Sequence, residues 1–268
     1  MSRNLYIVPY DFTPVTDKAV EYALHIGKYV DTEIRIIHLA ANEAKAKFKD
    51  KLLEDVKNKL KIPHGVEVTT AVKVGDIFTD IGKIAKEEKA QLVIMGTHGI
   101  RGLQNVFGSF AMKVITSTEC AFLIVQKNTV FTEISDIVVP IDLTKESLQI
   151  VNIAGDMAKI MKARIHVLAK KQSDQILNTR LQNRLGIVKN QYKERGMESN
   201  LQLVDRGGRY SNKIMQFVRK NNIGMIAIAY HSESVFPQFD SFAQNLITNK
   251  QSIPVLIINS KLASTLYY

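Results

Sequence analysis

The chain has 268 residues, about twice the length of a typical domain, so we expect two domains. With 46% hydrophobic and 23% charged residues it has a globular rather than a disordered composition, and its longest apolar runs fall far short of the roughly 20 residues that cross a bilayer. The net charge of +10 favours anionic ligands, although the basic residues are spread along the chain.

The first residues lead directly into an apolar run at 5–8, which we predict to be a strand. Because no signal-type apolar segment or cleavage site precedes it, we expect a cytoplasmic protein. The helix that follows is predicted to begin with Thr13 as cap and Pro14 as first residue, where the missing amide hydrogen is not needed. Its apolar stripe at helical spacing consists of Val15, Ala19, Tyr22, Ala23, Ile26 and Val30.

Further strands are predicted in the first half at residues 34–39, 66–72, 92–95 and 122–125. The segments between them have helical period, and their expected apolar faces are Phe48, Leu52, Val56 and Leu60 in one helix and Ile77, Ile81 and Ile84 in the next. Strands that alternate with helices predict a parallel sheet with right-handed crossovers. Most of the strand runs are apolar throughout, so we expect helices on both faces of the sheet.

Two local features are interpreted as structural. Gly75 and Asp76 have the wrong spacing to Gly82 for a P-loop, and we interpret them as a turn and a helix start. Cys120, the only cysteine, precedes an apolar strand and is expected to be a small core residue, because no zinc-type cluster accompanies it.

The second half of the chain repeats the first. Residues 7–13 match 138–144 at an offset of 131, residues 92–98 match 225–231, and residues 123–125 match 255–257. The repeated strands are predicted at 137–139, 165–168, 201–204, 225–229 and 255–258. This duplication predicts an α/β protein of two tandem Rossmann-like domains at residues 1–130 and 135–262, each with a five-stranded parallel sheet.

Candidate binding residues follow two strands of the first half. Asp11 comes directly after the first strand, and a glycine-rich loop that runs from Gly96 to Ser109 follows the fourth. Ligands of open parallel sheets bind beyond the carboxyl ends of the strands, and glycines before a helix let backbone amides approach an anion. Asp11 could instead brace its own turn, and His98 in the loop could either contact a phosphate or pack locally.

These motifs make the chain resemble the universal stress protein A family. The resemblance rests on Ile-Val-Pro-Tyr-Asp-Phe-Thr at 7–13, Met-Gly-Thr-His-Gly at 95–99, Gly-Ser at 108–109 and Phe-Leu-Ile-Val at 122–125. It covers residues 1–127 and, through the repeat, 135–260. It implies the Rossmann-like fold of the adenine nucleotide α-hydrolase type and ATP, alone or with Mg²⁺, as the ligand of the first domain.

The resemblance also implies roles for single residues. Gly96, Gly99, Gly108 and Ser109 would contact the phosphates, Asp11 the ribose, and the backbone around Leu39 the adenine. Pro9, Met95, His98 and Phe110 complete the candidate set. Eight residues separate Gly99 from Gly108, whereas ATP-binding members have nine, so the loop amides could be displaced from the phosphates.

The second half departs further from the family pattern. Its equivalent of the glycine-rich loop, residues 229–241, contains no glycine, and Glu233 and Asp240 would repel a phosphate. Asp142 is retained after the first strand. We therefore expect a degenerate second domain without the phosphate site.

The resemblance implies a cytoplasmic stress-response sensor that binds ATP in its first domain and passes this signal to an unidentified protein partner. The alternative is a stress scaffold that binds no nucleotide. No catalytic or metal-ligand set can be drawn from the residues, so any ATP hydrolysis is expected to be slow. Two chains could associate as a homodimer; membrane binding is not expected, and nucleic-acid binding is disfavoured because the strands lack paired exposed aromatics.

Overall fold

The computed structural model describes residues 3–97, 107–118, 120–230 and 241–260, and for residues 107–111 it describes the backbone alone. The first half contains the strands β1 (Asn4–Pro9), β2 (Thr32–Ala40), β3 (Val66–Val74), β4 (Leu92–Thr97) and β5 (Ala121–Gln126), and the helices α1 (Pro14–Gly27), α2 (Glu43–Asn58), α3 (Ile77–Glu87) and α4 (Phe107–Thr116). The second half contains the strands β6 (Asp136–Pro140), β7 (Arg164–Lys170), β8 (Ser199–Val204), β9 (Met225–Tyr230) and β10 (Val255–Asn259), the 3-10 turn η2 (Glu146–Leu148), and the helices α5 (Ile150–Met161), α6 (Gln175–Glu194), α7 (Tyr210–Lys220) and α8 (Ser241–Ile247).

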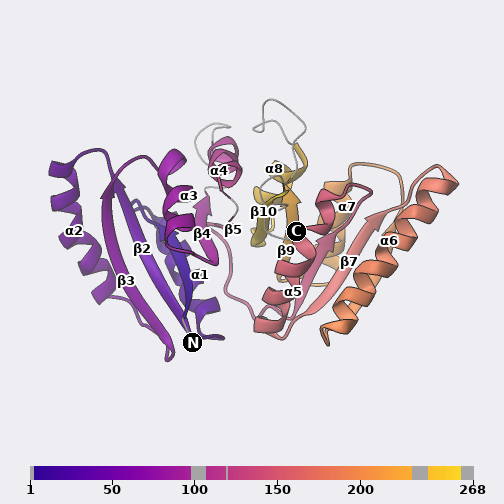
Figure 1. Cartoon of the computed structure of the whole chain (residues 1–268), viewed down its shortest axis with the longest axis horizontal. Helices are drawn as coiled ribbons and strands as arrows, with labels where there is room; N and C mark the ends of the chain where they lie inside the picture. Colours follow the sequence, from indigo (N-terminus) through magenta and orange to yellow (C-terminus); the bar gives the residue numbers. More distant parts are fainter. Residues whose placement is uncertain (1–2, 98–106, 119, 231–240, 261–268) are drawn as a thin grey trace.

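The described strands form one ten-stranded sheet in the order β3-β2-β1-β4-β5-β10-β9-β6-β7-β8. Pairing within each half is parallel, and β5 pairs with β10 in the antiparallel sense at the centre, where Figure 1 shows the two halves meeting. The predicted pair of five-stranded α/β units is therefore confirmed. The domain boundaries at 130 and 135 stay a prediction.

The central pairing shows how the halves correspond. Leu123 lies opposite Leu256, and the parallel neighbours of these two residues, Ile94 on β4 and Ala227 on β9, are separated by the same 133 residues. An internal two-fold axis therefore passes between Leu123 and Leu256 and relates this part of the two halves at an offset of 133. The sequence match of 123–125 with 255–257 is one residue out and was wrong. Leu123 and Leu256 pack in one core cluster whereas Val255 packs in the other. In a strand that is apolar on both faces, a slip of one residue leaves the hydrophobic pattern unchanged.

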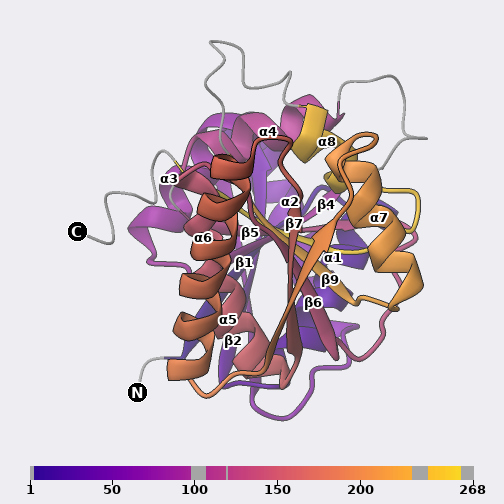
Figure 2. The same ribbon diagram turned by 90° about the vertical axis from the view of Figure 1, so that its right-hand side faces the viewer.

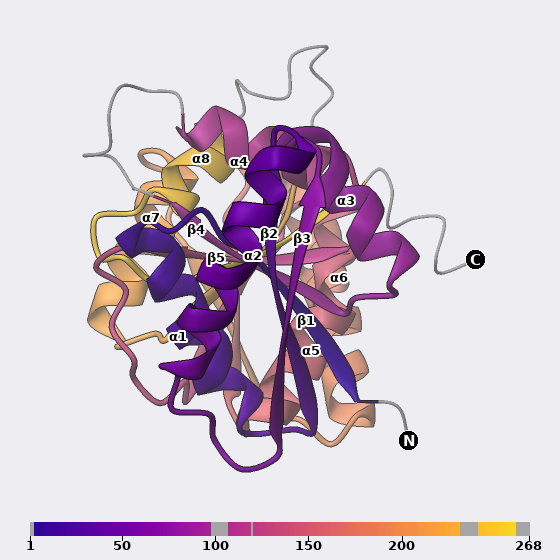
Figure 3. The ribbon, with the colours of Figure 1, turned by 90° about the vertical axis from the view of Figure 1, so that its left-hand side faces the viewer.

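Helices cover both faces of the sheet, as predicted. In the second half, α5 and α6 lie on one side of the strands and α7 and α8 on the other (Figure 2). In the first half, α1 and α2 lie on one side and α3 on the other (Figure 3). The core is divided accordingly into one cluster with α1, α2, α5 and α6 and a second with α3, α4, α7 and α8.

The helix predictions hold for α1 and fail in part for α2. Thr13 is the N-cap of α1 and Pro14 its first residue, and the predicted stripe is buried from Val15 to Ile26. Its last predicted member, Val30, lies beyond the end of the helix at Gly27 and is half-buried. In α2, however, Phe48 is 67% exposed, and Leu53 is the fully buried residue. The helix covers only the two outer strands β3 and β2, so a narrow stripe is enough to reach the core.

Among the helices within the described ranges, none combines the length and the apolar character that crossing a bilayer requires.

Candidate functional site

The strand order reverses between β1 and β4, and a cavity of about 450 Å³ opens there at the carboxyl ends of the strands. Cavities of several hundred Å³ at this point of an open α/β sheet are typical small-molecule sites. Its lining includes five predicted site residues: Pro9, Asp11, Leu39, Met95 and Gly96. The structure thus brings together residues from three separate strands and the turn after β1.

Asp11 braces the turn between β1 and α1 and also faces the cavity. Its Oδ1 accepts hydrogen bonds from the Thr13 amide at 3.1 Å, the Thr13 hydroxyl at 2.6 Å and the Thr16 hydroxyl at 2.9 Å. No hydrogen bond from a described residue reaches the other oxygen, Oδ2. One carboxylate oxygen therefore fixes the turn while the second is available to a ligand.

Gly96 is required by packing at the end of β4. A Cβ on this residue would lie 2.4 Å from the carbonyl oxygen of Val15 in the first turn of α1. Its counterpart in the second half is Ala229, and there the turn η2 precedes α5 in place of a helix that begins directly. The absence of a side chain at Gly96 lets α1 begin close against β4, beside the cavity.

Two polar residues of the lining were not predicted. Thr97 at the end of β4 is 2% exposed, and its hydroxyl has no hydrogen-bond partner among the described residues. His38 on β2 donates from Nδ1 to the Tyr10 carbonyl at 2.7 Å. A buried hydroxyl without a partner costs roughly 1–3 kcal/mol, so Thr97 marks a place where a polar ligand atom would be stabilised.

The β3–α3 turn forms a further wall of the cavity. Asp76 is the N-cap of α3 and accepts from the Phe78 amide at 2.8 Å, as the interpretation of a helix start requires. Gly75, Asp76, Ile77 and Phe78 all line the cavity as well. The signal that could have identified them is their position after a parallel strand, because all such turns lie at the same edge of the sheet.

The phosphate half of the predicted site lies only partly within the described residues. His98 and Gly99 lie outside the described residues. Gly108, Ser109 and Phe110 belong to the first turn of α4, for which the backbone alone is described. Their contacts with a phosphate therefore stay a prediction.

The equivalent cavity of the second half is smaller, about 210 Å³. Tyr210, the counterpart of Ile77, donates from its hydroxyl to the Leu168 carbonyl at 2.5 Å and stacks on Phe242 with 5.8 Å between ring centroids. Asp142 repeats the brace of Asp11 by accepting from the Thr144 amide at 2.8 Å. The second half thus keeps the turn, while a stacked aromatic pair lines its smaller cavity.

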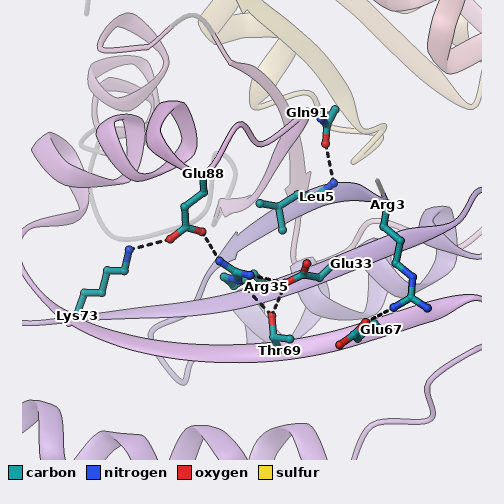
Figure 4. Close-up of polar contacts among 9 residues, drawn as sticks. All are labelled: Arg3, Leu5, Glu33, Arg35, Glu67, Thr69, Lys73, Glu88 and Gln91. Carbon is teal, nitrogen blue, oxygen red and sulfur yellow. Dashed lines mark hydrogen bonds and ion pairs between the residues drawn. The ribbon is translucent and has the colours of Figure 1, made fainter. Parts of the chain in front are cut away.

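A charged cluster on the first half has a structural explanation (Figure 4). Arg35 on β2 donates to Glu33 at 2.5 Å and to Glu88 at 2.8 Å, and Lys73 on β3 donates to Glu88 at 2.8 Å. Glu88 is the C-cap of α3, so the cluster fastens the end of this helix to the sheet. Within the described ranges, no group of three or more His, Cys, Asp or Glu side chains is placed to hold a metal ion.

Cys120 agrees only in part with its interpretation as a core residue, because it packs against one core cluster but is half-buried. Its thiol contacts the Ala90 carbonyl oxygen at 3.3 Å, and burial raises the thiol pKa to about 12. A thiol of this kind is almost wholly protonated near neutral pH and is a poor nucleophile.

Comparisons with known proteins agree with this geometry. The model of the universal stress protein family matches residues 6–126. A curated universal stress protein of Methanocaldococcus jannaschii is 30% identical over 47% of this chain and 85% of its own length, and one of Bacillus subtilis is 28% identical over 46% and 99%. The solved structure of a universal stress protein from Archaeoglobus fulgidus has a TM-score of 0.77 at 16% identity over 97% of this chain and 100% of its own, a likeness of fold that spans both halves.

Proposed function

Because the chain belongs to the universal stress protein family, we propose that it binds ATP or a closely related nucleotide in the cavity of its first half and acts as a nucleotide-dependent stress sensor. The observation that carries this proposal is the cavity of about 450 Å³ at the strand-order reversal, with the free oxygen of Asp11 and the unpartnered hydroxyl of Thr97 in its lining. Both groups suit the hydroxyls and ring nitrogens of a nucleoside.

The apolar part of the cavity lining supports a nucleoside rather than a wholly polar ligand. The lining contains the apolar side chains of Leu39, Met95 and Phe78, which suit one face of a base, beside the polar groups at the strand ends. Any Mg²⁺ would arrive bound to the phosphates. The second half, with about 210 Å³ and the Tyr210–Phe242 pair, has no comparable space, so we propose one nucleotide per chain.

The remaining expectations belong to the same proposal. The protein would act in the cytoplasm and signal through an unidentified protein partner. Association of whole chains into a homodimer would use a surface other than the β5 edge, because β10 of the same chain already pairs with β5.

The test is calorimetric titration with ATP and Mg²⁺, on protein first checked for nucleotide carried through purification. We expect about one ATP per chain. Asp11→Ala should weaken binding about tenfold or more, because a hydrogen bond to a charged group contributes roughly 1.5–3 kcal/mol. Asp142→Ala is the matched control, since it removes the same turn brace from the second half and should leave ATP affinity unchanged.

Each outcome separates the alternatives. Equal loss of stability in the two variants with loss of binding only in Asp11→Ala supports the ribose role. An ATP affinity of folded Asp11→Ala protein equal to that of the parent chain would reject the site. The absence of both binding and copurified nucleotide would favour the scaffold, with the eight-residue loop segment between Gly99 and Gly108 as the physical cause.

A further inference from the structure

A separate cavity of about 610 Å³ lies between the two halves, at the amino-terminal ends of β1 and β4 and the start of β5. We call it the interdomain cavity. On one side α5 of the second half contributes the apolar residues Ile153, Met157 and Ile160, and on the other side Tyr6, Leu92 and Cys120 belong to the first half. It lies at the opposite end of the strands from the proposed nucleotide site, and the inference below does not depend on that site.

The groove related to this cavity by the internal two-fold axis is filled by the linker, residues 127–135. Ile134 of the linker is 2% exposed. The Phe131 ring lies 5.8 Å from the ring of Tyr22 and 5.7 Å from that of His25, both on α1. The same histidine bonds through Nε2 to the Thr132 carbonyl at 3.2 Å. The linker is thus packed against α1 of the first half and against the residues just before β9 in the second half.

The walls of the filled groove and of the interdomain cavity correspond residue by residue. On the helices the offset is 131. It relates Tyr22, His25 and Ile26 of α1, and Tyr29 just after its end, to four residues of α5 that all line the cavity: Ile153, Asp156, Met157 and Ile160. Just before β4 and β9 the offset is 133, and it relates Gln91, which lines the cavity, to Gly224. Gly224 touches the linker, because a Cβ there would lie 3.2 Å from Ile134. The linker fills the groove beside α1, whereas the equivalent position beside α5 is the interdomain cavity.

The chain after β10 is the counterpart of the linker. Gln126 at the end of β5 donates from Nε2 to the Asn249 carbonyl at 2.9 Å, and Asn259 at the end of β10 donates from Nδ2 to the Thr116 carbonyl at 3.1 Å, so both strands end in equivalent settings. Because Ile257 pairs with Phe122, the antiparallel register brings the end of β10 beside Cys120 in the cavity lining.

The composition of the following segment suits the interdomain cavity. At the offset of 133, residues 260–268 correspond to the linker 127–135, and they include Leu262, Leu266, Tyr267 and Tyr268. The offset of 133 relates Ile134 to Tyr267. We propose that the segment 261–268 docks in the interdomain cavity as the linker docks in its groove, with Tyr267 in the place that corresponds to Ile134. Docking would fasten α5 to the first half, as the linker fastens α1 to the second.

A single fluorescent reporter tests the docking, because the chain contains no tryptophan. In the full chain, Tyr267→Trp should give an indole with blue-shifted emission and several-fold weaker quenching by acrylamide than a free peptide of the same tail sequence. Adding Ile160→Glu, which places a charge in the cavity wall at a partly exposed position, should restore the emission and quenching of the free peptide. The same addition should speed thiol modification of Cys120 several-fold.

The matched control is Ile187→Glu, the same change on the exposed face of α6, where Ile187 is 64% exposed. It should leave both readouts unchanged, and thermal melting should show that both glutamate variants fold. An indole quenched as strongly as in the free peptide overturns the proposal. Two other results would also overturn the proposal, provided that the indole is exposed throughout. If Ile160→Glu lowers the molecular mass in solution, a second copy of the chain occupies the cavity. If it releases a copurified small molecule, that molecule is the occupant.

Discussion

The absence of a side chain at Gly96 allows α1 to pack closely against β4 and so shapes one wall of the candidate site. A Cβ would lie 2.4 Å from a backbone oxygen of α1, which cannot move away as the end of a flexible side chain could. We expect Gly96→Ala to lower the free energy of unfolding by about 1–3 kcal/mol, measured by urea denaturation. The matched control Ala229→Gly should cost no more than about 1 kcal/mol, the usual conformational penalty of glycine. Equal stability of Gly96→Ala and the parent chain would contradict the packing argument.

Asp136 at the start of β6 is expected to make the free energy of unfolding depend on pH in the acidic range. Burial alone would raise the pKa of this carboxyl group, but hydrogen bonds from Arg164 at 3.0 Å and His166 at 2.7 Å outweigh burial and lower the pKa below its usual value. A lowered folded-state pKa means that the stabilisation is present above the unfolded pKa, about 3.9, and is lost as pH falls through the folded value.

Asp136→Asn should therefore destabilise the protein near neutral pH by about 1–3 kcal/mol, because His166 and Arg164 lose a charged acceptor that is itself buried. The gap between variant and parent should close as pH falls below about 4, measured by urea denaturation over a pH series. Asp205→Asn, at a carboxylate that is 81% exposed, is the control and should change little at any pH. A gap that stays constant with pH would contradict the assignment.

Among the elements, α3 depends most clearly on polar contacts at its end. Glu88, whose side chain is 18% exposed, joins Arg35 and Lys73 at the end of this helix (Figure 4). We expect Glu88→Ala to cost about 1–2 kcal/mol, more than an exposed ion pair, because the two cations lose a partly buried partner. Glu87→Ala, one residue earlier and exposed, is the control in the same denaturation experiment. A similar small effect of both changes would show that the cluster does not anchor the helix.

The strands were predictable because their apolar runs are bounded by turns and recur in the second half. The buried face of α2 was not, since Phe48 and Leu53 both fit a helical stripe and only the width of the sheet beneath decides which is buried. The turn η2 also escaped prediction, because the sequence from Asp142 to Thr144 repeats that from Asp11 to Thr13. The structural difference coincides with a distant residue, Ala229 in place of Gly96.

The candidate site could be predicted where a motif lies next to a strand end. Asp11 and Gly96 were identified in this way, Leu39 came from the family resemblance alone, and all three line one cavity. Thr97 and the wall formed by residues 75–78 were missed, because their role depends on which turns the strand order brings together. The pattern of residues 75–78 is fully explained by a helix start, so it carries no separate sign of a ligand.

At the scale of the whole molecule, the antiparallel pair β5–β10 places in one polypeptide a contact that two separate chains would have to form by collision. Its strength is then set by an effective concentration fixed by the linker, and dilution does not weaken it. The second half is therefore under two different constraints. Its contact surface along β10 must be kept, whereas the residues that line its cavity can change. The aromatic pair of Tyr210 and Phe242 is what such freedom would permit. A chain of this kind would respond to ligand as a single-site receptor, with a simple saturation curve at any protein concentration.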